Sequence, residues 1–340
     1  MPTHFRAHPH PLAVAALLLA VLAGLIVLGA CVGSTGFSPV WRVFDDAGAL
    51  QIVRDIRLPR SVAAALAGAL LGLGGALAQG LFRNPLADPY LLGSAAGASL
   101  GVACALAVMG ASPVGLLWVQ RLGLTGAAFV GAMGAALLTV LLAGGAVQSL
   151  RLLLSGVVVG VVLAALASLV MLGSPDVLMS MQAFLLGSTA LAGWEACAVM
   201  AAALVVSLAT ATLLARGLDG LILGEDTASS LGVPVHHLRL VLLAALALAT
   251  GAAVAQTGLI AFVGLAAPHA VRAMLRVSHR SLLGLSALAG GVLLCAADVL
   301  ARWVAAPLEL PVGLLTALLG GAYLLRVLGK QAHLHVADPR

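Results

Sequence analysis

Long apolar runs separated by short polar breaks follow one another along almost the whole chain. Most of the runs reach about 20 residues, the length at which an α-helix crosses the hydrocarbon core of a bilayer. The pattern therefore predicts an all-α polytopic membrane protein with about ten transmembrane helices in a single transmembrane domain over residues 1–340. We expect the spans at about 12–32, 57–82, 90–109, 122–143, 151–172, 194–214, 240–257, 258–272, 282–301 and 311–328.

Some stretches depart from the pattern of full-length spans. Residues 258–272 are short, interrupted by glycine and contain Pro268, so we expect a shortened span. Residues 177–190 are too short to cross a bilayer, and we expect a re-entrant or interfacial helix there. The first apolar run ends in a sequence similar to a lipoprotein cleavage box, but its length favours a retained helix. Residues 33–56 are expected to form an external loop.

A six-residue sequence occurs twice, and the two copies indicate an internal repeat. Residues 74–79 read Gly-Gly-Ala-Leu-Ala-Gln, and residues 251–256 read Gly-Ala-Ala-Val-Ala-Gln. Each copy is followed by a break that contains proline. The copies lie five spans apart and therefore run in opposite directions, which is the arrangement of the inverted repeats found in many transporters.

A polar stretch, Arg216–Arg239, lies between long apolar runs, after the sixth span and before the seventh. Its acidic residues and Pro234 cannot lie in hydrocarbon, where charges and irregular backbone would go unsatisfied. Leu221, Ile222 and Leu231 are nevertheless too apolar for a simple solvated linker. We expect a pair of short amphipathic helices at the membrane surface, with Gly232 in a left-handed conformation just after the second. This pair is either a docking element for a soluble partner or an ordinary loop.

Composition and charge support the membrane class and suggest an orientation. The chain is 62% hydrophobic and 9% charged, whereas soluble domains are about 25% charged. The net charge of +5 does not indicate a nucleic-acid partner, because the arginines are scattered between spans. Eleven of the 17 Lys and Arg residues fall inside when both termini are placed in the cytoplasm, so the positive-inside rule favours that orientation.

The sequence also argues against several kinds of chemistry. Lys330 is the single lysine, and its neighbours do not match a P-loop, so the chain is not expected to hydrolyse ATP. The four cysteines stand alone, and we expect no metal site, no cofactor and no catalytic residues. An ion-coupled secondary transporter is the alternative class, with Asp298 as its main candidate, but such intramembrane acids are scarce here.

Five motifs occur in an order that resembles one family over about residues 12–330. They are Arg57–Arg60 (RLPR), Arg83–Pro89 (RNPLADP), Leu223–Val233 (LGEDTASSLGV), Phe262–His269 (FVGLAAPH) and Leu310–Gly313 (LPVG). With these motifs the chain resembles the FecCD-type permeases, which belong to the type II ABC importers of iron-siderophores, heme and cobalamin. The Arg-Asn-Pro form of the second motif slightly favours heme or a siderophore as the substrate.

The resemblance implies a bacterial inner-membrane protein that works by alternating access. It implies ten helices per subunit and a homodimer with the translocation path at its interface. The implied partners are two ATP-binding cassette ATPase subunits on the cytoplasmic face, a periplasmic substrate-binding protein outside, and membrane lipid.

The resemblance also carries roles to individual residues. It assigns docking of the ATPase to Gly224, Glu225, Ala228, Ser230, Leu231 and Gly232, where apolar and glycine positions would fill a cleft and the acids would bond at its rim. It assigns docking of the binding protein to Arg57, Arg60 and Arg302, although these arginines could instead anchor helix ends, and Arg302 could pair with Asp298 one turn earlier.

Two further sites follow from the same resemblance. A cytoplasmic gate is expected at Gln148, Ser149 and Leu150, where leucine departs from the small hydroxylated residues of the family. His269 follows a Pro-His pattern, and we expect a buried, hydrogen-bonded histidine at a helix break rather than a metal ligand.

Overall fold

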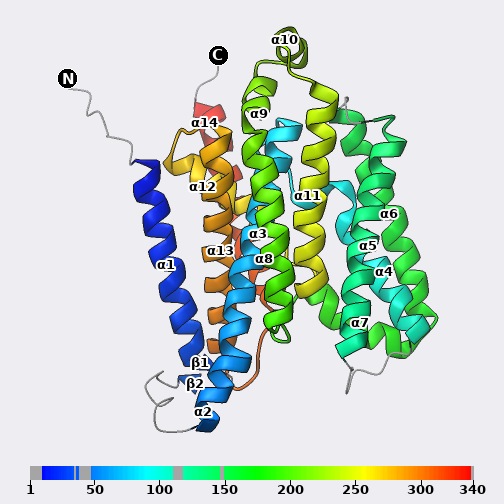
Figure 1. Cartoon of the computed structure of the whole chain (residues 1–340), viewed down its shortest axis with the longest axis vertical. Coiled ribbons are helices and arrows are strands. Elements are labelled where there is room, and N and C mark those ends of the chain that lie inside the picture. The colour runs from blue at the N-terminus through cyan, green and yellow to red at the C-terminus, as the bar shows by residue number, and fades with distance from the viewer. Residues whose placement is uncertain (1–9, 34–35, 38–46, 110–117, 146–148, 338–340) are drawn as a thin grey trace.

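The computed structural model is a bundle of helices, most of which run along the long axis of the molecule (Figure 1). It describes residues 10–33, 36–37, 47–109, 118–145 and 149–337. The first half of the chain forms α1 Pro11–Cys31, β1 Val32–Gly33, β2 Gly36–Phe37, α2 Ala47–Ile52, the π-helical segment η2 Val53–Arg57, α3 Leu58–Phe82, the 3₁₀ turn η3 Pro89–Leu92, α4 Ser94–Met109 and α5 Trp118–Leu142. The second half forms α6 Ser149–Leu172, α7 Pro175–Leu186, α8 Trp194–Leu213, α9 Ala215–Ile222, α10 Glu225–Ser230, α11 Val235–Thr257, α12 Val263–Met274, α13 His279–Trp303 and α14 Val312–Ala337.

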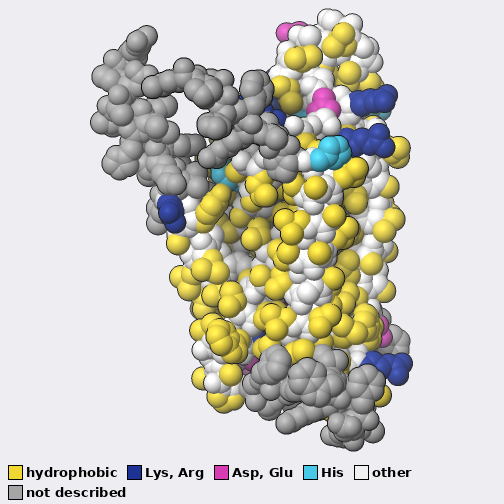
Figure 2. All heavy atoms as spheres, turned by 90° about the vertical axis from the view of Figure 1, so that its left-hand side faces the viewer, with side chains coloured by type: hydrophobic (Ala, Val, Ile, Leu, Met, Phe, Trp, Pro, Cys, Tyr) yellow, Lys and Arg dark blue, Asp and Glu magenta, His cyan; other side chains and the backbone are white. Residues whose placement is uncertain are grey.

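The expected all-α membrane fold is confirmed. Seven helices in the described ranges are long and apolar enough to cross a bilayer, and shorter apolar helices lie at 94–109, 175–186 and 312–323. The ten expected spans fall on α1, α3, α4, α5, α6, α8, α11, α12, α13 and α14. Figure 2 shows hydrophobic side chains over the middle of one face, with charged and histidine side chains toward its two ends. This distribution suits a bilayer around the middle of the bundle.

The segment after α1 differs from the expected external loop. Val32–Gly33 pairs with Gly36–Phe37 in a small antiparallel hairpin, and helix begins again at Ala47. The helix then continues through η2 into α3, so that Gly48–Phe82 forms one helical stretch of 35 residues. Arg54, Asp55 and Arg57 suggest a loop when hydropathy is considered, but charges do not prevent a helix outside the hydrocarbon core.

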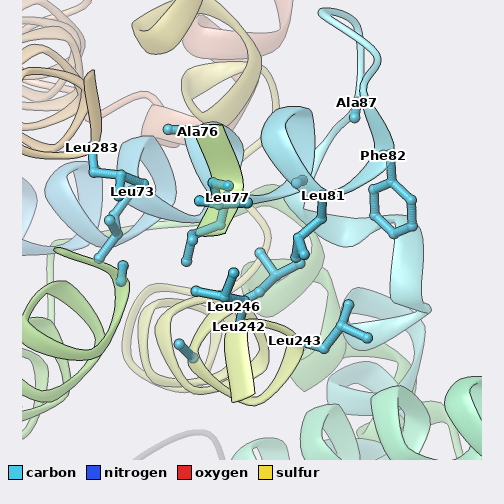
Figure 3. Packing of buried hydrophobic residues seen from close by; sticks show 14 of the residues in the cluster. Leu73, Ala76, Leu77, Leu81, Phe82, Ala87, Leu242, Leu243, Leu246 and Leu283 are labelled. Atoms are coloured by element: carbon cyan, nitrogen blue, oxygen red, sulfur yellow. The ribbon is translucent and has the colours of Figure 1, made fainter. Parts of the chain in front are cut away.

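Helix α3 lies at the centre of the bundle and contacts α13, α11, α12 and α8. Glycine permits some of these contacts, because a Cβ on Gly75 would clash with the carbonyl oxygen of Gly264 in α12. Where α3 and α11 meet, leucine side chains of the two helices point toward one another (Figure 3). The buried residues Leu73, Leu77 and Leu81 belong to the same cluster as Leu242 and Leu246.

The two copies of the six-residue sequence lie on α3 and α11, which run in opposite directions (Figure 1). The breaks that follow them meet inside the bundle, where the Tyr90 hydroxyl donates a hydrogen bond of 3.0 Å to the carbonyl oxygen of Ile260. Arg83 and Phe262 have positive φ in these breaks, at 50° and 69°, a conformation that is uncommon for residues other than glycine. The arrangement agrees with the inverted repeat expected from the sequence.

Candidate functional site

Helices α9 and α10 stand at one end of the molecule, near the start of α1 and the end of α14 (Figure 1). They connect α8 to α11 and form the pair of short helices expected within Arg216–Arg239. We call residues 215–233 the α9–α10 segment. Helix α10 ends where Gly232 adopts φ of +81°, so the predicted left-handed position is confirmed. The amide of Val233 donates to Ala228 O at 3.0 Å and that of Gly232 to Ser229 O at 2.9 Å, which is the Schellman pattern of helix termination.

The α9–α10 segment exposes large apolar side chains at its tip. Leu231 is 67% exposed, and Ile222 and Leu223 are exposed to a similar extent. The two halves of the segment are also anchored from within, because Ala228 is buried with Leu218 and Leu221 in the main core cluster. The segment therefore combines a fixed base with an apolar tip at one end of the molecule.

The residues predicted to dock an ATPase do not all face outward. Leu231 is exposed, whereas Ala228 packs inward and the Ser230 hydroxyl donates to the carbonyl oxygen of Asp226 in its own helix at 2.8 Å. Gly224 and Gly232 have positive φ and shape the two ends of α10. Ile222 and Leu223 are exposed but were not among the predicted residues, although the apolar character of Ile222 in a polar stretch was the signal that could have identified it.

Glu225 joins the α9–α10 segment to the transmembrane bundle. Its carboxylate lies 3.1 Å from Nη2 of Arg83, at the end of α3, and 2.7 Å from Nη2 of Arg239, in α11. The Arg239 side chain is almost fully buried, so this pair is screened less than a surface pair. Sequence reasoning placed Glu225 at the rim of a partner, but in this structure its carboxylate is bound within the chain.

A second polar contact holds α9 to the start of α13. Oδ1 of Asp219 accepts a hydrogen bond of 3.1 Å from the backbone amide of His279 and lies 2.7 Å from Nδ1 of the same residue. The carboxylate thus satisfies a free amide in the first turn of α13, where negative charge is favourable. The α9–α10 segment is therefore linked to α3 and α11 through Glu225 in α10, and to α13 through Asp219 in α9.

The opposite end of the molecule holds a buried cluster of two arginines and two carboxylates, which we call the arginine–carboxylate cluster: Arg60, Asp298, Arg302 and Glu309. Nε of Arg60 lies 3.1 Å from Asp298, and its Nη1 lies 2.6 Å from Glu309. Arg302 pairs with the other oxygen of Asp298. Thr189 adds a hydrogen bond of 2.6 Å to Asp298. The cluster is formally neutral and joins α3, α13 and the segments that precede α8 and α14.

The prediction that Arg302 meets an external partner needs correction. Its side chain is 1% exposed and donates to the carbonyl oxygen of Gly29 at 2.8 Å and to the hydroxyl of Ser61 at 3.0 Å. The alternative pairing with Asp298, one turn earlier, is what the structure contains. Arg60 is also buried, at 6% exposure. Arg57 is half-buried, and its Nη1 donates long hydrogen bonds to backbone carbonyls at the end of α1.

The predicted gate and the predicted histidine contact are only partly visible. Gln148 and the side chain of Ser149 lie outside the described residues, and Leu150 is exposed in the first turn of α6. His269 is half-buried rather than buried, and it packs edge-on against Tyr323 with ring centroids 5.7 Å apart. Among the described residues its imidazole has no hydrogen-bond partner, which differs from the expected hydrogen-bonded histidine.

Comparison with known proteins connects this architecture to membrane transport. Residues 16–330 match the FecCD transport family. The hemin transport system permease protein HmuU of Yersinia pestis is 37% identical over 319 residues, which cover 93% of this chain and 94% of that protein. The cobalamin import system permease protein BtuC of Halobacterium salinarum is 41% identical over 281 residues, which cover 82% and 73%. A solved structure described as an inward-facing conformation of a putative metal-chelate type ABC transporter superimposes with a TM-score of 0.84, at 28% identity, over 94% of this chain and all of that one.

Proposed function

This chain belongs to the FecCD transport family, and from that membership we propose that it is the permease subunit of an ATP-driven importer for a bulky metal chelate. It is a transport subunit and not an enzyme, since in ABC transporters a separate subunit hydrolyses ATP. The chain is a multi-pass protein of the inner membrane. We propose that both termini and the α9–α10 segment lie in the cytoplasm, where ATP is available.

The apolar tip of the α9–α10 segment is the observation that supports the proposal best. Leu231, Ile222 and Leu223 are exposed at one end of the molecule, where the rest of the described chain does not cover them. Exposed apolar side chains that cluster in this way mark contact sites. An ATPase docked on this tip would act on α3, α11 and α13 through Glu225 and Asp219.

The rest of the proposed cycle follows from the family. Two copies of the chain form a homodimer with the path at their interface, and ATP binding moves the two subunits between inward-open and outward-open states. A periplasmic binding protein delivers the substrate. Relatives are named for hemin, for cobalamin and for ferric enterobactin, so heme, cobalamin and a ferric siderophore are all candidate substrates.

Ion-coupled transport receives less support from the geometry. Asp298 was its main candidate, but both carboxylate oxygens of this residue are bound to arginines. These ion pairs hold Asp298 in a structural contact between α3 and α13, which leaves its carboxylate engaged within the chain.

The substitution Leu231→Asp tests the docking role. A charge placed at an apolar contact leaves it desolvated and unpaired, which typically costs about 3–5 kcal/mol. We expect normal insertion of the permease but loss of ATPase co-purification and of ATP-dependent uptake in proteoliposomes. The control is Leu308→Asp, which makes the same change at an exposed position at the opposite end of the molecule. Full ATPase assembly and wild-type uptake by the Leu231→Asp variant would contradict the proposal.

A further inference from the structure

A cavity of about 640 Å³ opens beside the α9–α10 segment. Its walls come from the end of α3, from α9, from the end of α12 with the loop after it, and from the start of α13. Three arginines line it: Arg83, Arg272 and Arg276. The other walls include the apolar side chains of Ile222, Leu275 and Leu282, so the lining is basic in one part and apolar in another.

The charges around this cavity do not balance within the described part of the chain. Asp219 is the one carboxylate in the lining, and it is bound to His279. Arg83 is paired with Glu225. Arg272 is half-buried, and its partner in the described structure is the neutral side-chain amide oxygen of Gln79. Arg276 makes no hydrogen bond or ion pair to any described residue. Two guanidinium groups without a carboxylate therefore face one cavity.

We propose that this cavity binds a phosphate group that carries a net negative charge. A guanidinium group donates two parallel hydrogen bonds to phosphate oxygens, and two such groups on one cavity wall suit a phosphate monoester or diester. The anionic head of a phospholipid and free phosphate share this chemistry. The apolar walls favour the phospholipid, whose glycerol and upper acyl chain would lie against Leu275 and Leu282.

The site goes beyond the proposed function, because occupancy requires neither the ATPase nor the transported substrate. It has a mechanical consequence for the α9–α10 segment. A phosphate group held by Arg272 and Arg276 lies against α9, so it adds a contact between α9 and the α12–α13 loop beside the Asp219–His279 pair.

Native mass spectrometry of the purified chain in neutral detergent tests the proposal, with phosphatidylglycerol, phosphatidylcholine and inorganic phosphate as probes. Arg276→Gln is the main variant, because Arg276 is exposed and we expect its substitution to leave the fold intact. Arg272→Gln is the second variant. Arg280→Gln is the matched control, since Arg280 is an exposed neighbour that does not line the cavity. We expect a preference for phosphatidylglycerol over phosphatidylcholine that falls about tenfold in each of the two variants and is unchanged in the control.

The probes separate the two sources of phosphate. If phosphatidylglycerol is preferred and millimolar phosphate does not displace it, the ligand is the lipid. If inorganic phosphate binds and neither lipid is preferred, the ligand is the free ion. In both cases the binding is lost in Arg276→Gln and Arg272→Gln. Equal binding of phosphatidylglycerol and phosphatidylcholine, in the wild type and in these variants alike, would overturn the proposal. So would an absence of binding accompanied by weaker ATPase co-purification in Arg276→Gln, because the cavity would then be part of the protein contact. Neither result depends on Leu231, so the two proposals fail separately.

Discussion

Asp298 balances the charge of the arginine–carboxylate cluster, because it is fully buried and binds both Arg60 and Arg302. The substitution Asp298→Asn would remove the carboxylate that these two buried guanidinium groups share. Breaking a buried ion pair from one side typically costs about 3–5 kcal/mol. We expect a clearly lower midpoint of thermal unfolding in detergent, followed by fluorescence or by loss of the monodisperse peak in size-exclusion chromatography.

Glu309→Gln is the control for Asp298→Asn. The Glu309 side chain is 31% exposed, so water can replace part of its interaction with Arg60. We expect a much smaller shift for this variant. Equal shifts for the two variants would show that burial of Asp298 does not determine the stability of the cluster.

At the scale of single residues, the sequence predicted local contacts better than distant ones. The left-handed Gly232 follows from its position after a short helix, and the Asp298–Arg302 pair follows from their spacing of one helical turn. The burial of Arg60 could not be predicted in this way. Its partners Asp298 and Glu309 lie 238 and 249 residues away, so only the packing of α3 against α13 and against the segment before α14 brings them together.

At the scale of elements, Glu225 holds the α9–α10 segment through the ends of α3 and α11. We expect Glu225→Gln to weaken both contacts, because a neutral amide loses the charge of the ion pairs. Backbone amides in residues 223–233 should then exchange hydrogen for deuterium faster, while the exchange in α3 and α13 stays unchanged. Hydrogen–deuterium exchange mass spectrometry of the purified chain measures both.

Asp226→Asn is the matched control, because Asp226 is the neighbouring acid, is exposed, and has no side-chain ion pair among the described residues. Its substitution removes the same charge from the same helix. Faster exchange in both variants to the same extent would attribute the effect to helix charge alone, and the role of Glu225 as a connection would be wrong.

The sequence predicted most elements because a transmembrane helix needs a long apolar run, and such runs are visible without tertiary information. The stretch before α3 was missed for the opposite reason. Arg54, Asp55 and Arg57 interrupt the hydropathy signal, although residues such as Ala47, Leu50 and Gln51 suit a helix. Hydropathy finds where a helix lies in lipid but not where it continues into water.

At the scale of the whole molecule, the orientation of the chain can be tested with two single cysteines. Glu195 is exposed at the start of α8, and Ser229 is exposed in α10, so one transmembrane helix separates them. In a background without the four native cysteines, we expect a membrane-impermeant maleimide added to whole spheroplasts to label Glu195→Cys and not Ser229→Cys. Both should react after lysis. Labelling of Ser229→Cys in intact spheroplasts would refute the cytoplasmic placement of the α9–α10 segment.

The overall architecture could be predicted because the five motifs fix the order of the spans, whereas the cavity beside α9 could not. Arg83 lies far from Arg272 and Arg276 in the sequence, and Arg276 follows the end of α12. Nothing in their local sequence indicates that the three line one cavity. Their meeting depends on where α3 ends, where α12 ends and how α9 folds back against both.

The continuous helix from Gly48 to Phe82 is longer than a bilayer is thick. A straight α-helix of 35 residues measures about 52 Å, against about 30 Å for the hydrocarbon core. Even with a tilt of about 20°, more than 15 Å of it stands clear of the hydrocarbon. The first turns, with the exposed side chains of Leu50, Ile52 and Ile56, therefore form a raised ridge at the end opposite α10. This stretch lies in the headgroup layer or in water, where a soluble protein on that side can contact it.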